Sequence, residues 1–158
     1  MGDARTEAAR GGAGNGARIG GAGVERKRYS LRRRLLAMDL HAFRVERGRK
    51  TENLLKEDHR DLKRFFALDQ SAYRDGALPG RTKELLGMVA SAVLRCNDCI
   101  VYHLDRCVEE GWTREELLDA LNVALVVGGS ITIPHIRTCW ETVDQLFEEK
   151  EAGSRPGR

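Results

Sequence analysis

Residues 83–103 read KELLGMVASAVLRCNDCIVYH, a strongly apolar run that leads into a pair of cysteines. The run before the first cysteine is apolar nearly all round a helix, which is typical of a helix buried at the centre of a core. Cys96 and Cys99 then stand three residues apart, and His103 follows four residues later. We therefore expect a helical core that carries either a redox site or a metal site.

The spacing of Cys96, Cys99 and His103 suits thiol chemistry. At ~100° per residue, the three side chains fall within an arc of roughly 60° on one helix face. Two thiols so placed can form a disulfide with little backbone movement, and a base one turn away can take the thiol proton. If Asn97 or Asp98 caps this helix, Cys99 lies in its first turn, where the helix dipole and free N–H groups favour the thiolate.

The composition limits the core that a single chain can form. The 158 residues are 41% hydrophobic, 6% aromatic and 32% charged, enough for one modest domain. Helices that are apolar on several sides therefore predict burial between subunits, and so a homo-oligomer.

No run of 18 apolar residues occurs and residues 1–30 lack a secretory hydrophobic segment, so we expect a cytoplasmic protein without a membrane partner. In a reducing compartment, a C-x-x-C pair is more often catalytic or metal-binding than structural.

Positive charge is concentrated in the first third of the chain. Residues 1–50 hold 13 Lys and Arg against 5 Asp and Glu, whereas the other 108 residues hold 14 against 19. A basic arm can bind nucleic acid or an anionic surface. Because this arm lacks interleaved aromatic residues and a folded nucleic-acid motif, we predict no specific nucleic-acid binding.

The chain divides into four segments. We expect residues 1–30, rich in Gly and Arg, to be disordered, because they cannot bury enough apolar surface to offset the entropy of ordering. Residues 31–52 form a basic arm that permits a short helix, residues 53–150 form the folded domain, and residues 151–158 form a flexible tail. No strand signal compares with the helical signals, so the predicted fold class is all-α.

Within the folded domain, the ends of several helices can be predicted. The apolar spacing after Asn53 indicates a first helix that breaks at Gly76, and Pro79 suits the start of the next. Gly111 ends the cysteine helix, and Thr113 begins another through a capping box with Glu116.

The last two helices meet at a pair of glycines. The helix that begins at Thr113 ends at Gly128-Gly129, and a final helix starts near Pro134 and runs to Phe147 before the charged tail.

The run from about Leu62 to Phe147 resembles the carboxymuconolactone decarboxylase-like superfamily, and within it the branch related to alkyl hydroperoxidase D. The motifs that carry the resemblance are Lys83-Glu84-Leu85-Leu86, Cys96-x-x-Cys99-x-x-x-His103 twelve residues after Glu84, Gly111-Trp112-Thr113 with Glu115-Glu116, and Gly128-Gly129. This likeness implies an antiparallel helical bundle that assembles as a trimer or hexamer.

The same resemblance implies a thiol-dependent peroxidase. Cys99 would be the peroxidatic thiol, Cys96 the resolving thiol, His103 the base or proton relay, and Glu84 the carboxylate that orients His103. The Cys99 thiolate would attack a peroxide oxygen to give a sulfenic acid, which Cys96 condenses into a disulfide. The expected substrate is a hydroperoxide or a disulfide, the reductant is an external thiol protein or small dithiol, and no metal or organic cofactor is needed.

Two positions complicate this assignment. On one unbroken helix Glu84 would lie ~18 Å from Cys96, so only a bend between two helices brings it to the site; otherwise it is a solvated or salt-bridged residue. Asp98 stands where the best-known members of the branch carry a histidine, and its charge opposes thiolate formation and predicts weak activity. The decarboxylase members generally lack the cysteine pair, which argues against decarboxylation.

Other functions remain open from the sequence. One is a non-catalytic helical module whose cysteine pair is structural or binds zinc, with His135 and Cys139 as further ligands if the helices meet. A continuous helix after the C-x-x-C pair argues against the tight knuckle that zinc usually occupies. Another is a redox sensor whose basic arm, residues 1–50, contacts a partner.

The remaining cysteine, aromatic and histidine residues have simpler interpretations. Cys107 is most simply a small core residue. Trp112 and Trp140 are packing residues rather than substrate platforms. We interpret His41 and His59 as surface residues.

Overall fold

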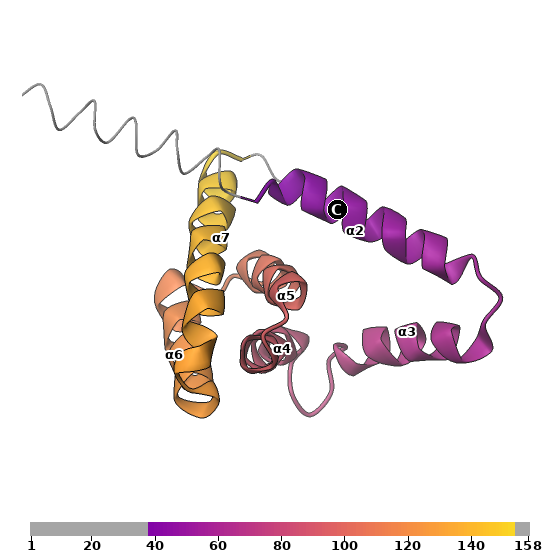
Figure 1. Ribbon diagram of the computed structural model, residues 1–158, viewed down its shortest axis with the longest axis horizontal. Coiled ribbons are helices and arrows are strands. Elements are labelled where there is room, and N and C mark those ends of the chain that lie inside the picture. The colour runs from indigo at the N-terminus through magenta and orange to yellow at the C-terminus, as the bar shows by residue number, and fades with distance from the viewer. Residues whose placement is uncertain (1–37, 154–158) are drawn as a thin grey trace, which may run out of the picture. The chain divides into compact units, whose positions relative to one another are not determined.

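The computed structural model describes residues 38–153, all of which belong to one compact unit. In this range the chain forms α-helices and one short 3-10 helix and contains no strand, which confirms the all-α prediction. The elements are α2 (Leu40–Leu55), α3 (Arg60–Ala72), α4 (Gly80–Leu94), α5 (Asn97–Glu109), α6 (Arg114–Gly128), η1 (Ser130–Thr132) and α7 (Ile133–Glu151) (Figure 1). The predicted disorder of residues 1–30 and most of the predicted tail lie outside the described residues.

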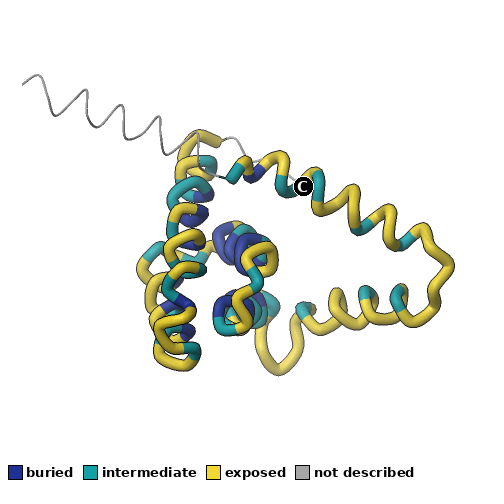
Figure 2. The backbone as a smooth tube through the Cα atoms, viewed as in Figure 1, coloured by how far each residue is buried: buried dark blue, intermediate teal, exposed yellow. Residues whose placement is uncertain are grey.

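The hydrophobic core lies between α4, α5, α6 and α7. Helix α4 packs against α5 and α6, and α5 packs against α7. Figure 2 shows the buried residues concentrated on these four helices, whereas α2 and α3 are largely exposed. The buried apolar residues are Leu40, Met88, Ala92, Ile100, Val101, Leu104, Cys107, Val108, Leu117, Leu121, Ala124, Cys139, Val143 and Leu146. Trp112 and Trp140 are partly buried against this core, as predicted for packing residues.

Helix α4 is not buried all round, contrary to the expectation from its apolar sequence. Met88 and Ala92 are fully buried, but Leu86 is 53% exposed and Leu94 is 75% exposed. The sequence pattern counts apolar residues without regard to which face a neighbouring helix covers. In this chain only one side of α4 meets α5 and α6.

The connection between α4 and α5 is a two-residue turn built on Arg95. Arg95 adopts a left-handed conformation with φ 61° and ψ 33°. Its N–H donates to the Ala92 carbonyl, and the Cys96 N–H donates to the Ser91 carbonyl, which is the hydrogen-bond pattern of a Schellman motif. This turn supplies the bend between the two helices that allows α4 and α5 to pack together.

Several helix ends agree with the sequence analysis. Gly111 takes a positive φ of 86° just after α5, and Gly129 takes 74° after α6. Thr113 and Glu116 form the predicted capping box at the start of α6. The predicted cap of α5 is wrong, however, because the N-cap is Cys96 rather than Asn97 or Asp98.

The boundary of the first predicted helix is also wrong. Instead of one helix from Asn53 onward, α2 ends at Leu55 and α3 begins at Arg60. The exposed His59 caps α3, its Nδ1 accepting a hydrogen bond of 3.3 Å from the Leu62 N–H. Histidine is not among the usual N-cap residues, so the sequence pattern gave no sign of a new helix start at residue 59.

Helices α2 and α3 contribute little to the core. Leu40 is the buried residue of α2, and α3 has none, with Phe65 and Leu68 each 65% exposed. Among residues 38–153, no helix has both the length and the apolar character needed to cross a bilayer.

Candidate active site

Cys96 and Cys99 form a disulfide at the start of α5, with their Cα atoms 5.3 Å apart. Cys96 is the N-cap residue and Cys99 lies in the first turn, where backbone N–H groups have no carbonyl partner within the helix. Cys99 is exposed, whereas Cys96 is half-buried. The predicted proximity of the two thiols is confirmed, and the more exposed residue is the one expected to meet a substrate.

His103, one turn after Cys99 on α5, forms a buried pair with Glu84 of α4. The distance between His103 Nδ1 and Glu84 Oε2 is 2.8 Å, and the two residues are 8% and 5% exposed. Glu84 reaches the site because the left-handed turn at Arg95 folds α4 back along α5. Of the alternative that Glu84 is solvated or salt-bridged, only the solvated part is wrong, because Glu84 is buried and also pairs with Arg106. The bend implied by the family resemblance is present.

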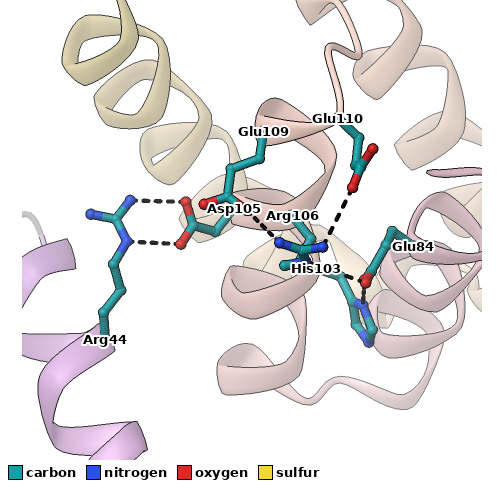
Figure 3. A network of polar contacts seen from close by, with 7 residues as sticks. All are labelled: Arg44, Glu84, His103, Asp105, Arg106, Glu109 and Glu110. Carbon is teal, nitrogen blue, oxygen red and sulfur yellow. Dashed lines mark hydrogen bonds and ion pairs between the residues drawn. The ribbon is translucent and has the colours of Figure 1, made fainter. Parts of the chain in front are cut away.

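Arg106 completes the charge pairing of Glu84, a contact that the sequence analysis missed. Its Nε lies 3.4 Å from Glu84 Oε1, and its other nitrogens reach Glu109 and Glu110 one turn along α5 (Figure 3). Burial alone lowers the pKa of Arg106, but the hydrogen bond and charge of Glu109 and the charge of Glu84 raise it overall. Arg106 therefore stays charged and neutralises part of the carboxylate cluster around Glu84.

Two tyrosines enclose the imidazole of His103, and the sequence analysis singled out neither. Tyr73, which follows α3, places its hydroxyl oxygen 3.4 Å from His103 Nε2. Tyr102 packs edge-on against the same ring, with centroids 5.1 Å apart, and carries Arg47 over its own face at 3.7 Å. Both phenol pKa values are raised, chiefly by burial. The tertiary packing that brings Tyr73 to His103 leaves no periodic signal in the sequence.

His135 contacts the turn that carries the dithiol and does not join Cys139 in a metal site. Its Nδ1 lies 2.7 Å from the side-chain oxygen of Asn97, which stands between the two cysteines. Cys139 is 2% exposed in the core. Residues 38–153 contain no group of three or more His, Cys, Asp or Glu side chains able to hold a metal ion. The zinc alternative thus gains no support from the described part of the chain.

Cys107 is a core residue, as the sequence analysis proposed. It is fully buried, and burial together with the charge of Glu84 raises its pKa to about 12. Burial likewise raises the pKa of Cys139 to about 12. Neither thiol is in the ionised form that reacts at neutral pH.

Comparison with known proteins assigns the family. The model of the carboxymuconolactone decarboxylase family matches residues 62–141, about half of the chain. The chain belongs to this family. The matched region of this family member contains the dithiol, the buried His103–Glu84 pair, Arg106 and Tyr73, whereas α2 lies outside it.

Relatives of this carboxymuconolactone decarboxylase family member include proteins of known structure. A family protein from Thermotoga maritima, whose involvement in an antioxidative response has been suggested, shares 50% identity at a TM-score of 0.68, over 70% of this chain and 95% of that one. A family protein from Legionella pneumophila shares 29% identity at a TM-score of 0.62, over 68% of this chain and 96% of its own. Uncharacterized protein 4 in the cox locus of Paracoccus denitrificans is 30% identical over 82 residues, 52% of this chain and 74% of its own.

Proposed function

We propose that this protein is a thiol-dependent peroxidase that reduces hydroperoxides through Cys99 and Cys96. The observation that carries the proposal is the Cys96–Cys99 disulfide at a helix N-terminus, one turn before the buried His103–Glu84 pair. The suggested antioxidative role of the Thermotoga maritima relative supports the same chemistry.

The proposed cycle begins with the reduced dithiol. His103 takes the proton of the Cys99 thiol, and the thiolate attacks the terminal oxygen of a hydroperoxide, breaking the O–O bond. The imidazolium returns its proton to the departing oxygen, which leaves as an alcohol or as water. Cys99 is now a sulfenic acid, and the Cys96 thiol displaces its hydroxyl as water to form the disulfide. An external dithiol then reduces this disulfide by exchange and is itself oxidised.

The groups around Cys99 affect its ionisation and the proton transfer in this cycle. The first turn of α5 stabilises the Cys99 thiolate through its free N–H groups and its dipole. Glu84 accepts the Nδ1–H of His103 and so keeps Nε2 available for the proton. Asp98, exposed in the same first turn, opposes the thiolate by its charge, which predicts a modest rate.

The proposed cycle requires a reducing partner and a reducing compartment. A protein that must be reduced after every turnover needs a dithiol donor, either a small dithiol or a thiol protein, in a reducing compartment such as the cytoplasm. A homo-oligomer, trimeric or hexameric by family likeness, is supported by Val126, Leu94 and Val127, which are 77%, 75% and 70% exposed in the single chain. Light scattering of the purified protein measures this state directly.

The test is to titrate thiols before and after one equivalent of hydroperoxide, and to identify the product by intact mass. The parental protein should lose two thiols and two mass units, and Cys99→Ser should lose its peroxide reaction. Cys107→Ser is the matched control, because Cys107 is fully buried and should not contribute. Peroxide consumption by Cys99→Ser at the parental rate, or oxidation without an internal disulfide, contradicts the proposal.

A further inference from the structure

The imidazole of His103 is contacted at both of its nitrogens. Nδ1 pairs with Glu84 at 2.8 Å, and Nε2 lies 3.4 Å from the hydroxyl oxygen of Tyr73. The Tyr73 ring is also stacked against the imidazole, tilted by 35° with centroids 5.2 Å apart. Tyr73 thus meets His103 at the nitrogen that the proposed cycle uses for the proton.

The contact between Tyr73 and His103 depends on a glycine inside α4. A Cβ atom at Gly87 would lie 2.7 Å from His103 Cε1 and 2.8 Å from the Tyr73 hydroxyl oxygen. Glycine within a helix is less stable than alanine because it loses more backbone freedom on folding. The lack of a side chain at Gly87, one turn after Glu84, leaves the space in which His103 and Tyr73 meet.

A phenol suits both protonation states of the imidazole. When the ring is neutral and donates Nδ1–H to Glu84, the Tyr73 hydroxyl can donate to the lone pair of Nε2, and it releases that lone pair as Nε2 takes the thiol proton. When the ring takes a proton, Nε2–H can donate to the Tyr73 oxygen instead. Burial, with the charges of Asp69 and Glu84, raises the phenol pKa, so Tyr73 keeps its proton at neutral pH.

We propose that Tyr73 is a positioning residue of the proton relay, which orients the His103 imidazole through its contact with Nε2 in both steps of the cycle. Gly87 provides the space that this contact requires. The inference rests on the proposed peroxidase function, because it concerns the proton that His103 carries for Cys99. The charged and titratable groups that face the pair are Glu84 on α4, Asp69 on α3, and Tyr102 and Arg106 on α5.

The experiment compares Tyr73→Phe with Tyr102→Phe in the full chain. Both changes keep an aromatic ring against His103, but only the first removes a hydroxyl that contacts Nε2. The rate constant for disulfide formation with hydrogen peroxide, measured from pH 5 to 9, is expected to fall about tenfold in Tyr73→Phe, a fraction of the full contribution of a general acid or base. Its pH profile should also shift. Tyr102→Phe should stay within about twofold of the parental rate, with the parental profile, because its hydroxyl is outside the relay.

A second comparison tests whether the space at Gly87 is required. Gly87→Ala should reproduce the slow reaction of Tyr73→Phe. Gly48→Ala is its control, since a Cβ at Gly48 in α2 meets nothing within 4 Å. Equal rates for Gly87→Ala and Gly48→Ala would remove Gly87 from the inference.

The ¹⁵N chemical shift of His103 Nε2 separates this inference from the peroxidase proposal. It should change in Tyr73→Phe and not in Tyr102→Phe, whether or not peroxide reacts. If the parental protein forms no disulfide with peroxide, the peroxidase proposal fails, and the relay is then judged by this shift and by the rate at which dithiothreitol reduces the disulfide. An unchanged Nε2 shift together with parental rates in Tyr73→Phe overturns the inference.

Discussion

The four cysteines show how the position of a residue decides its chemistry. Cys96 and Cys99 lie at the start of a helix, where Cys99 is an exposed residue and Cys96 a half-buried one. Cys107 and Cys139 lie in the core, and burial raises both thiol pKa values to about 12. The sequence distinguished these two classes by spacing alone, because only the C-x-x-C pair has the geometry of a dithiol.

Alkylation of the reduced protein should therefore label two thiols and spare two. At pH 8, iodoacetamide should modify Cys96 and Cys99 in the folded protein and all four cysteines after unfolding in urea, as measured by intact mass. Since the folded pKa values of Cys107 and Cys139 are raised, the unfolded chain loses these protons first as the pH increases. Stability should fall from about pH 9 upward, by at most about 1.4 kcal/mol per unit of pH and thiol. Rapid labelling of three or more thiols in the folded protein contradicts this assignment.

At the scale of the helix, structural features with a local cause could be predicted from the sequence, and features that depend on tertiary packing could not. Gly111 and the Thr113–Glu116 capping box could be predicted because their physical causes lie within a few residues of the helix end. The cap of α3 was missed, because His59 replaces the usual small polar residue.

The contact between Glu84 and His103 depends on tertiary packing. It depends on a left-handed Arg95, and nothing in the local sequence requires that conformation of an arginine. Only the family resemblance pointed to the contact, and Tyr73 and Arg106, which no motif marked, were missed entirely.

Substitutions at Arg95 should show how much the α4–α5 turn contributes. The left-handed conformation costs a non-glycine residue roughly 1 kcal/mol, so Arg95→Gly should leave the free energy of unfolding unchanged or raise it by up to about 1 kcal/mol. Arg95→Val should lower it by about 1–2 kcal/mol, because a β-branched residue tolerates this conformation least. Urea unfolding measures both, and Arg137→Val, at an exposed position of α7, controls for the loss of an arginine. Equal stabilities for Arg95→Gly and Arg95→Val would show that the turn is not strained.

Across the described residues, the four core helices and the first two helices are held in different ways. Helices α4 to α7 share a continuous apolar core, whereas α2 contributes only Leu40 and the partly buried Phe43 to it and is also attached by polar contacts. Arg44 donates to both carboxylate oxygens of Asp105 on α5 at 2.8 Å (Figure 3). It also donates to Glu149 on α7 at 3.0 Å. The hydrogen bond to Asp105 is the largest cause of the raised pKa of Arg44. One guanidinium therefore ties α2 to two helices of the core.

Arg44→Ala should loosen α2 without unfolding the core helices. Removing a bidentate, partly buried ion pair leaves Asp105 with a weaker set of partners and should cost about 1–2 kcal/mol of α2 docking. Hydrogen exchange followed by mass spectrometry should show faster exchange of the α2 amides and unchanged protection in α5 and α6. Arg49→Ala is the matched control, because Arg49 pairs with Glu46 on the exposed face of α2 itself and touches no other helix through that pair. If exchange in α2 is equally fast in both variants, the attachment of α2 lies in the packing of Leu40 and Phe43 on the core and of Arg47 on Tyr102 rather than in Arg44.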